Sequence, residues 1–497
     1  MAAKEPSHTA FSRTAFFNSR VPDSMRAKSA AVIVKPDTHC AELVSLLAST
    51  RKSCALVTDS AGHPLGIITE QDIARRVAYR VPPDTPVDKV MTAPVLTVQR
   101  GQPLYQAVAV LLRHDFQQIP VVDHQGQLAG ILSLRDIQMA ASGGLMHQIE
   151  QLSHEGTTEG LQAVKAARIE LAQALFADNV PATEIQRLLT SINNDLYRRI
   201  GEMALKQMAA EGWGDPPVHA ATIVMGSGGR GENFLFPDQD NGFIIADYPD
   251  REHTRIDAFY IELAEQLCRI LNEIGFPYCK GHCMAVNPLW RKTLSQWIEQ
   301  IKLWGQKSNF VAIRLSDIFF DFQPVWGDVE LAHQLRRTVS RLIQKNPFFL
   351  KQMFLDKTQH NVALGFLGRF VTEKANRDYR GQIDLKYTGT VPLVGAVRLL
   401  ALREGVEETP TLERIRALGK LGVFSASEQE DLSAAFSLLA EILLEKQLAD
   451  FNSGRRVGYY VDPKTLSKRQ RWLLLDALRS INALRDRVHY EFTAQLF

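Results

Sequence analysis

The order of apolar and polar positions near the start of the chain repeats once, and each copy predicts the same elements. Residues 66–73 (GIITEQDI) and 130–137 (GILSLRDI) share one pattern, and the residues before them match as well. Each stretch reads as two short apolar strands joined by a polar turn and followed by the start of a helix. A further strand and an amphipathic helix precede each copy, with the helices expected at 41–48 and 104–113. The repeat therefore predicts two related modules over residues 25–142.

Two kinds of residue recur where the predicted helices begin. Thr69 and Ser133 stand at the N-cap position, and Asp72 and Asp136 fall in the first helical turn. With these residues the repeat resembles a pair of CBS domains, a Bateman module. The resemblance implies a cleft for an adenine nucleotide, in which the aspartate holds ribose hydroxyls and the hydroxyl residue contacts phosphate or ribose. A carboxylate accepts two hydroxyl hydrogen bonds and a helix N-terminus favours phosphate, but the same four side chains can also serve only as helix caps.

Helical spacing follows the repeat. Apolar residues between 152 and 200 recur at i, i+3, i+4 and i+7, which indicates helices that bury one face. We interpret residues 143–214 as a helical connector, which is either a spacer packed on its neighbours or an arm that transmits a signal or contacts a second copy. The run 212–217 (GWGDPP) marks a break. A domain with strands is expected at 215–335, and helices are expected over 336–497.

A glycine-rich stretch and two aspartates carry the candidate chemistry. A strand is expected to end at Met225, and Gly226 and Ser227 then begin a turn (GSGGRGE) whose backbone amides can approach a phosphate closely. Asp238 and Asp240 follow on a predicted strand, where side chains at i and i+2 point the same way. Two carboxylates this close repel each other unless a cation lies between them. Magnesium prefers oxygen ligands of this kind together with substrate phosphates.

A third carboxylate is expected from a neighbouring strand. The run 317–322 (DIFFDF) places Asp317, Phe319 and Asp321 on one face if it is extended. Spacing alone does not separate the two aspartates. We select Asp321, which precedes Phe322-Gln-Pro, and keep Asp317 as the alternative.

These residues resemble the DNA polymerase β nucleotidyltransferase superfamily. More narrowly, they resemble proteins that join a CBS pair to a core similar to GlnD, the uridylyltransferase that modifies the nitrogen-signalling PII protein. The narrower resemblance spans residues 25–490 and includes the stretches 225–232, 238–241, 279–290, 321–327, 383–402, 411–414 and 462–463. Two positions depart from the family pattern, with Gln323 in place of arginine and His282 in place of glycine.

The resemblance implies transfer from a nucleoside triphosphate with the help of Mg²⁺ or Mn²⁺. Asp238, Asp240 and Asp321 bind the ions, and Asp321 also helps to deprotonate the incoming hydroxyl. The metal ions stabilise the attacking and leaving oxygens of an in-line displacement. The residues that the resemblance assigns to the triphosphate are Gly226, Ser227, Arg230, Glu232 and Lys386.

Two of these assignments have plainer alternatives. Arg230 and Glu232 either form an ion pair that fixes the turn, or Arg230 contacts phosphate directly, as a guanidinium fork can. Lys386 either reaches the triphosphate from the helical C-terminal region or lies on the surface, as lysines commonly do.

Composition narrows the range of partners. The chain has 57 basic and 55 acidic residues and a net charge of +2, which gives no reason to expect nucleic acid. No apolar run of about 18 residues predicts a membrane span. Residues 1–24 lack the apolar core of a secretory signal, so we expect a flexible tail and a cytoplasmic protein.

The cysteines predict neither disulfides nor a closed metal site. Five cysteines form an odd and sparse set for a chain of 497 residues, which argues against a disulfide framework. Cys279, His282 and Cys283 resemble a metal cluster, but no second pair of ligands stands at a matching spacing. Ordinary thiols near a strand or loop are therefore expected.

Together these features predict an α+β multidomain chain, with a tandem CBS module, a helical connector, a polymerase-β-like mixed α/β domain and an all-helical C-terminal domain. The expected function is metal-dependent transfer of a nucleoside monophosphate, by a uridylyl- or adenylyltransferase-like reaction, to a hydroxyl on a protein or small molecule. Adenine nucleotides at the CBS pair would regulate it, as in signal transduction. The alternatives are a non-catalytic nucleotide-sensing regulatory protein and an enzyme that modifies small molecules such as aminoglycosides. CBS pairs commonly associate, so a homodimer is expected.

Overall fold

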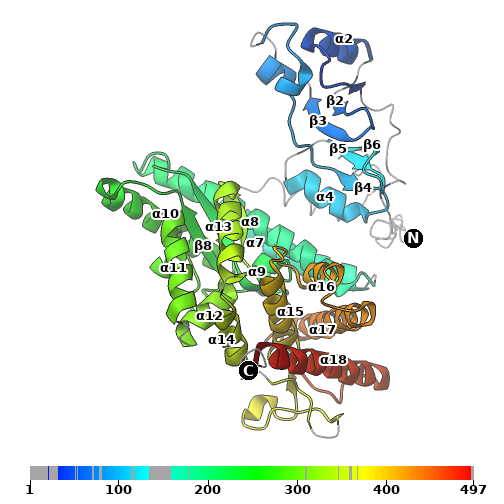
Figure 1. Cartoon of the computed structure of the whole chain (residues 1–497), viewed down its shortest axis with the longest axis vertical. Coiled ribbons are helices and arrows are strands. Elements are labelled where there is room, and N and C mark those ends of the chain that lie inside the picture. Colours follow the sequence, from blue (N-terminus) through cyan, green and yellow to red (C-terminus); the bar gives the residue numbers. More distant parts are fainter. Residues whose placement is uncertain are drawn as a thin grey trace, which may run out of the picture. The chain divides into compact units, whose positions relative to one another are not determined.

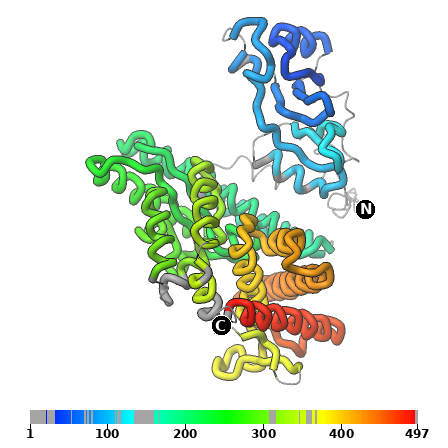
Figure 2. Tube along the Cα trace, viewed as in Figure 1, coloured from blue at the N-terminus to red at the C-terminus, as the bar shows by residue number. Residues whose placement is uncertain are grey.

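The computed structural model describes residues 21, 32–50, 52, 54–69, 72–77, 81–113, 116, 118–133, 158–177, 179–307, 310–344, 346–357, 361–365 and 368–493. The chain divides into two compact units, Met1–His154 and Glu155–Phe497. Figure 1 and Figure 2 draw the first unit in blue to cyan and the second in blue-green to red. Of the predicted tail, residues 1–24, only Val21 belongs to the described residues.

The first unit contains two copies of one strand–helix–strand–strand arrangement, as the sequence repeat predicts. In each copy the first strand runs parallel to the second, with partners such as Val32↔Ala55 and Val98↔Val121, and the third strand is antiparallel to the second. The first copy consists of β1 (Val32–Val34), α2 (Cys40–Thr50), β2 (Cys54–Thr58), β3 (Pro64–Thr69) and the π-helix η2 (Ile73–Val77). After the short helix η3 (Val87–Lys89), the second copy consists of β4 (Val98–Gln99), α4 (Leu104–Arg113), β5 (Gln118–Val122) and β6 (Leu128–Ser133).

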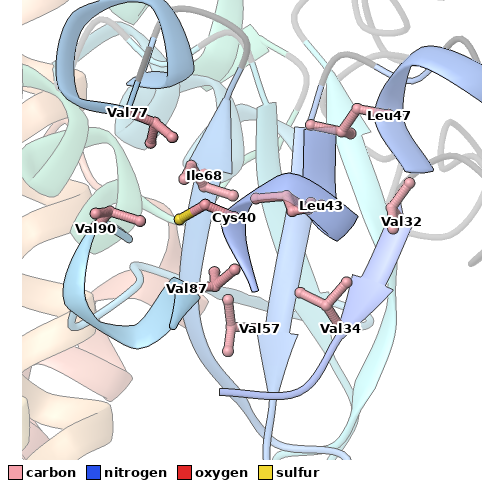
Figure 3. Close-up of a cluster of buried hydrophobic side chains, with 11 residues drawn as sticks. Val32, Val34, Cys40, Leu43, Leu47, Val57, Ile68, Val77, Val87 and Val90 are labelled. Atoms are coloured by element: carbon pink, nitrogen blue, oxygen red, sulfur yellow. The ribbon is translucent and has the colours of Figure 1, made fainter. Parts of the chain in front are cut away.

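An aliphatic core lies between α2 and the strands of the first copy. Cys40, Leu43 and Leu47 are buried and recur every three or four residues along α2, so they share one face of the helix. Figure 3 shows these side chains with Ile68 of β3 and Val87 in one cluster. The apolar stripe that the sequence shows in α2 is therefore the surface by which this helix packs on its sheet.

Two long helices open the second unit and pack within it. They are α7 (Thr158–Ala177) and α8 (Ala182–Ala210). Arg168 of α7 is fully buried, and its guanidinium donates to the Asn193 side chain of α8 and to the Leu235 carbonyl. Gly201 of α8 lies so close to the Trp326 ring that a Cβ atom on it would come within 2.5 Å of a ring carbon. The described helices of the predicted connector are thus a packed component of the second unit.

A four-stranded mixed sheet, in the order β10-β7-β8-β9, forms the centre of the second unit. Its strands are β7 (Ala220–Val224), β8 (Asn241–Ile245), β9 (Arg291–Thr293) and β10 (Gln323–Gly327). Strand β7 is antiparallel to both β8 and β10, and β8 is parallel to β9. Val224 pairs with Asn241 on one side and with Gln323 on the other. This register brings the residues after β7 and those before β8 and β10 to one edge of the sheet.

Helices surround this sheet, with α8 beside β10 and α13 beside β7 and β8. Helix α13 spans Val329–Gln344, and α10 (His253–Glu273) and α11 (Leu294–Lys307) also lie near the sheet (Figure 1). The short helix η4 (Asp250–Glu252) precedes α10 in the chain, and η5 (Pro288–Trp290) precedes β9. Tyr260 of α10 packs edge-on against Phe243 of β8, with the ring centroids 6.2 Å apart. The Trp297 indole of α11 donates to the Phe243 carbonyl at 2.9 Å.

The run 317–321 is not extended, and the expectation that its two aspartates share a strand face is wrong. Asp317 lies in α12 (Phe310–Phe319), and Asp321 lies in the turn between α12 and β10. The end of α12 packs in an aromatic cluster, in which Phe319 stacks on Trp297 at a centroid distance of 4.7 Å. Aromatic residues favour strands in isolation, but burial against neighbouring helices outweighs that preference here.

The remainder of the second unit is almost entirely helical, as predicted. Its helices are α14 (Pro347–Lys357), η7 (Arg377–Tyr379), the π-helix η8 (Lys386–Thr390), α15 (Val391–Glu404), α16 (Thr411–Lys420), α17 (Ala426–Asn452) and α18 (Lys468–Thr493). Residues 392–402 of α15 are all buried, which is typical of a helix enclosed by others. One short antiparallel pair joins β11 (Ile383–Asp384), which precedes η8, to β12 (Tyr460–Val461), which precedes α18. The predicted α+β class with a helical C-terminal region is confirmed. None of the described helices has the length and apolarity that a bilayer crossing needs.

Candidate functional site

A glycine turn follows β7 and lies against two aspartates. The short helix α9 (Gly226–Arg230) starts with Gly226 at φ +56°, in the left-handed region that favours glycine. A Cβ atom on Gly226 would lie 3.1 Å from a carboxylate oxygen of Asp240. A Cβ atom on Gly229 would lie 1.7 Å from the carbonyl oxygen of Asp321. The absence of side chains at these two glycines therefore lets the turn approach both aspartates closely.

Asp238 and Asp240 lie in an extended segment that leads into β8, rather than on the strand itself. Gln239 between them is fully buried, and its side chain donates to the carbonyls of Cys268 (3.0 Å) and Phe276 (2.9 Å). Because side chains alternate along extended backbone, the two aspartates point away from Gln239 and toward the same side. Asp238 is exposed and Asp240 is partly buried. The structure thus brings this carboxylate pair beside the glycine turn.

The carboxylate pair lacks full compensation of its charge. Burial, followed by repulsion from Asp238, raises the pKa of Asp240 well above its ordinary value, and Lys386 opposes this rise. A raised carboxylate pKa means that the charged form is disfavoured. The pair is therefore a place where a bound cation would gain favourable electrostatic energy.

A cavity of about 130 Å³ lies between the glycine turn and the helical C-terminal region. Its lining includes Gly226, Ser227 and Asp238 from the glycine turn and the segment before β8, and Lys386 and Arg398 from the helical C-terminal region. The remaining lining residues include Gln186, Arg230, Glu232, Phe234, Pro237, Asp317, Ile318, Thr390, Val391, Val394, Phe436, Ala440 and Tyr459. The cavity therefore joins all the predicted triphosphate-binding residues with one aspartate of the pair. Asp240 borders a second, smaller cavity that Ser227 and Asp238 share.

Lys386 is not the surface lysine of the plainer alternative. Its ammonium lies over the Tyr459 ring, 4.2 Å from the centroid. Burial lowers the pKa of Lys386, but the Tyr459 oxygen and the Asp238 carboxylate, among other groups, raise it more, so it lies above the ordinary value. The structure therefore keeps a positive charge on the wall of the cavity that Asp238 also lines.

Asp321 lies at the centre of a buried ionic cluster. Its side chain is completely buried, and three guanidinium groups contact its two oxygens. Arg230 of α9 and Arg414 of α16 donate to it at 2.7 Å each, and Arg398 of α15 is the third donor. Burial would raise the pKa of Asp321, but Arg398, Arg414 and Arg230 lower it far below the ordinary range. Arg398 also pairs with Asp317.

The expected cluster of three aspartates does not form. Among the described residues, Asp238, Asp240 and Asp321 do not make a group whose ligand atoms lie within 4.8 Å of one another. Asp321 is also absent from the cavity wall, whereas Asp317, the alternative, lies on it. The physical reason is that the three guanidinium groups satisfy both oxygens of Asp321 on the inner side of the turn.

Arg230 and Glu232 form the ion pair of the plainer alternative, at 2.6 Å. The other carboxylate oxygen of Glu232 accepts the backbone amide of Thr411 at 2.7 Å. Thr409 donates its hydroxyl to the Gly229 carbonyl at 2.7 Å and accepts the Gln323 side chain at 3.0 Å. The start of α16 therefore holds the glycine turn from the far side, and Gln323 takes part in that contact.

Sequence reasoning missed the contribution of α8 to this site. The Thr190 hydroxyl accepts the Asn233 amide at 3.0 Å, and the Gln186 side chain donates to the Glu232 carbonyl at 3.2 Å. Gln186, Thr190 and Asn193 are all buried. Their spacing of i, i+4, i+7 places polar residues on the buried face of an amphipathic helix, and this was the signal available in the sequence.

Sequence reasoning also missed a third potential metal ligand beside the cysteines near residue 280. All five cysteines are buried, and none of them is part of a disulfide. Cys279 and Cys283, however, share a cluster with Asp240, in which the three ligand atoms lie within 4.8 Å of one another. The third member comes from a different segment, so spacing within the run 279–283 does not reveal it.

In the first unit, Thr69 and Asp72 cap each other. The Asp72 carboxylate accepts the backbone amide of Thr69 at 3.0 Å and its hydroxyl at 2.8 Å, and the Thr69 hydroxyl accepts the Asp72 amide at 3.2 Å. Arg76 pairs with the other oxygen of Asp72. The second pair falls outside this description, because neither the side chain of Ser133 nor any part of Asp136 belongs to the described residues.

Three family models match the chain, one in each main region. The CBS domain model matches residues 26–79 and 81–143. The model described as "Putative nucleotidyltransferase DUF294" matches residues 166–310. The model described as "Putative nucleotidyltransferase substrate binding domain" matches residues 347–492.

Similar individual proteins match smaller portions. The chain is 32% identical over 117 residues to an uncharacterized 17.7 kDa protein of Acidianus ambivalens, a match that covers 24% of this chain and 71% of that protein. It is 35% identical over 106 residues to inosine-5'-monophosphate dehydrogenase of Mycobacterium bovis, covering 21% of this chain and 19% of the enzyme, so it spans about a fifth of that relative's length. A solved structure of an uncharacterized conserved protein from Pyrococcus horikoshii matches 26% of this chain and 96% of its own, with 26% identity and a TM-score of 0.24.

Gly229 is expected to tolerate no side chain, in contrast to its neighbour Gly228. Gly229→Ala would force a Cβ atom into the Asp321 carbonyl, whereas a Cβ atom on Gly228 would meet its nearest neighbour at 3.6 Å, an ordinary contact. We expect Gly229→Ala to lower the free energy of unfolding of the second unit by about 2 kcal/mol or more. Urea denaturation measures this loss, with Gly228→Ala as the matched control. Equal stabilities of the two variants would contradict the observed approach of the turn to Asp321.

Asp321→Asn is expected to leave three buried guanidinium groups without their shared counter-charge. The loss of stability at pH 7 should be about 3–5 kcal/mol. Because the pKa of Asp321 lies below its unfolded value of about 3.9, its stabilising contribution is complete at neutral pH and declines as the pH falls below about 4.

The difference in unfolding free energy between wild type and Asp321→Asn, measured by denaturation between pH 7 and pH 3, should therefore shrink toward the acidic end. The exposed residue Asp215 provides the control, since Asp215→Asn should change stability by less than about 0.5 kcal/mol. A difference that stays constant across this pH range would show that the ionised carboxylate is not what the arginines require.

Proposed function

We propose that this chain transfers a nucleoside monophosphate from a nucleoside triphosphate to a hydroxyl. The premise is that the chain belongs to the family that joins CBS domains to the two domains described as "Putative nucleotidyltransferase DUF294" and "Putative nucleotidyltransferase substrate binding domain". The acceptor is a hydroxyl on a protein or on a small molecule. The observation that carries the proposal is the cavity in which the glycine turn and Asp238 face Lys386.

The donor atoms beside this cavity suit a hard divalent ion. Asp238 and Asp240 offer carboxylate oxygens, the ligand type that Mg²⁺ and Mn²⁺ prefer. The raised pKa of Asp240 marks a pair that a cation would stabilise. We therefore assign Asp238 and Asp240 as the residues that hold the ion. When bound, the ion neutralises the charge that develops on the phosphate oxygens during displacement.

The other residues of the cavity would bind and orient the triphosphate. The bare backbone of Gly226 and the Ser227 hydroxyl admit phosphate oxygens next to the aspartate pair. Lys386 supplies a positive charge from the opposite wall. Arg230 and Glu232 serve indirectly, because their ion pair fixes the turn. Of the two further carboxylates, Asp317 is the one that the cavity offers, and Asp321 positions the turn through Arg230.

The position of Asp321 also favours one alternative. Two carboxylates remain for a metal ion, because three guanidinium groups pair with the third aspartate, Asp321. Such a site suits a protein that binds a nucleotide without transferring it. This second candidate is a non-catalytic nucleotide-sensing regulatory protein. Both candidates require the cavity, and only the first requires turnover.

A labelling experiment separates these candidates. Purified protein incubated with each labelled triphosphate, Mg²⁺ or Mn²⁺ and cell extract should place label on one acceptor. The variant carrying both Asp238→Asn and Asp240→Asn should lose at least about a hundredfold in rate, since it removes both metal ligands. Asp250→Asn, at an exposed site outside the cavity, is the matched control and should label normally. Triphosphate binding without label on any acceptor, under all these conditions, would favour the non-catalytic candidate.

We further propose that the first unit binds an adenine nucleotide and thereby regulates the second. The support is the match to the CBS domain family and the reciprocal pair Thr69 and Asp72 at the end of β3. A carboxylate in this position can accept ribose hydroxyls once Arg76 moves aside.

A binding measurement tests whether Asp72 is a ligand contact or only a cap. Asp72→Ala should weaken AMP or ATP binding, measured by calorimetry, by roughly tenfold or more, because it removes hydrogen bonds to a charged acceptor. Asp84→Ala, at an exposed loop of the same unit, should bind as wild type does. If Asp72→Ala lowers stability but leaves the affinity for AMP and ATP unchanged, Asp72 serves only as a helix cap. Turnover that is identical with and without saturating AMP would remove the regulatory half of the proposal.

A further inference from the structure

Two thiols and one carboxylate meet next to the candidate catalytic pair. The Sγ atoms of Cys279 and Cys283 and a carboxylate oxygen of Asp240 all lie within 4.8 Å of one another, and no other such group of three occurs among the described residues. Cys279 is 8% exposed and Cys283 is 1% exposed. The two sulfur atoms are therefore shielded from bulk water, and partly buried Asp240 connects them to the carboxylate pair.

The fold constructs this group through backbone hydrogen bonds between two segments. The amide of Gln239 donates to the Pro277 carbonyl at 3.0 Å, and the amide of Asn241 donates to the Cys283 carbonyl at 2.9 Å. These bonds flank Asp240 on both sides and fix the segment 277–283 beside it. Main-chain pairing thus holds the backbone that carries Asp240 next to the backbone that carries the two thiols.

A tight turn then directs both thiols to one side. The amide of His282 donates to the Cys279 carbonyl at 3.0 Å, and His282 has a left-handed backbone with φ +53°. A Cβ atom on Gly281 would lie 3.5 Å from each of the two sulfur atoms. The backbone at position 281 therefore lies beside both sulfur atoms, at ordinary contact distance for a Cβ atom.

The donor set differs in kind from that of the carboxylate pair. Thiolate ligands select soft or borderline ions such as Zn²⁺, whereas Mg²⁺ takes oxygen ligands. Zinc binds sulfur at about 2.3 Å and carboxylate oxygen at about 2.0–2.2 Å in a tetrahedron, so three ligand atoms already this close need only small movements. Three protein ligands leave a fourth position for water or a phosphate oxygen. A disulfide between the two cysteines would use the sulfurs alone and would give no role to the carboxylate.

We propose that Cys279, Cys283 and Asp240 bind one Zn²⁺-like ion, and that this ion withdraws Asp240 from the pair that holds the catalytic cation. Both thiols release their protons to solvent as the ion binds. The binding site stands on its own geometry, whereas its effect on turnover rests on the proposed function. The ion would act as a brake, since Asp238 alone holds Mg²⁺ less well than two carboxylates do.

Cobalt tests the site directly. Co²⁺ added to the reduced full-length chain should produce the near-ultraviolet absorption of cobalt–thiolate bonds, and Zn²⁺ should abolish it. Cys279→Ser or Cys283→Ser should each reduce the band to about half or less and weaken Zn²⁺ affinity roughly tenfold or more. Cys268→Ala is the matched control, because it removes a buried thiol of the same unit outside the group, and it should keep the full band. Asp240→Asn should weaken binding while the thiolate band remains visible at higher Co²⁺.

The outcomes separate the site from its effect. A reduced wild-type chain without the thiolate band, or a band unaffected by both serine variants, would overturn the site. The effect predicts that Zn²⁺ raises the Mg²⁺ concentration needed for turnover in wild type, and that it does not do so in the variant with both Cys279→Ser and Cys283→Ser. An equal Mg²⁺ requirement with and without Zn²⁺ would overturn the brake. Should no protein show turnover, the proposed function fails, and the cobalt band still decides the site.

Discussion

The buried carboxylate of Asp321 links two halves of the second unit, the part around the four-stranded sheet that carries the glycine turn and the helical C-terminal region. Its three guanidinium partners come from three places, Arg230 in the glycine turn, Arg398 in α15 and Arg414 in α16. A charge taken out of water is costly unless it is paired and fully hydrogen-bonded. The Asp321 carboxylate is therefore acceptable in the interior because these three partners surround it, whereas Arg230 also pairs with Glu232 and Arg398 also pairs with Asp317. The observed docking of the glycine turn against the helical region brings the three guanidinium groups to this one carboxylate.

The cavity follows from that docking. One wall belongs to the turn after β7, and the opposite wall belongs to η8 and α15, so neither half encloses the space alone. Thr409 and Thr411 contribute further bonds from the helical region to the turn. The proposed triphosphate site is thus a property of the interface between the two halves. This agrees with a family pattern in which a domain described by substrate binding accompanies the nucleotidyltransferase domain.

The sequence predicted what depends on neighbouring residues and missed what depends on distant ones. The CBS repeat and the approach of Asp238 and Asp240 to the glycine turn rest on short strands and a local hairpin, so periodicity and spacing were sufficient. Asp321 was harder, because the aromatic run before it fits both a strand and a helix, and packing against α11 selected the helix. The arginine cluster and the contacts of α8 join residues far apart in the chain, and no local sequence pattern predicts which buried charges will meet.

Asp240 belongs to both proposed metal sites of the second unit, and its charged form is disfavoured by its surroundings. Its carboxylate is partly buried beside Asp238, and this arrangement disfavours the charged form until a cation or proton relieves it. Two kinds of cation would compete for the Asp240 carboxylate. In the proposed scheme the oxygen ligands of the carboxylate pair attract a hard ion, and the sulfur atoms of Cys279 and Cys283 next to Asp240 attract a soft one. Because the backbone bonds around Asp240 fix its position between them, the residue does not need to move for the balance to change. The identity of the available cation then decides whether the carboxylate pair acts as a unit.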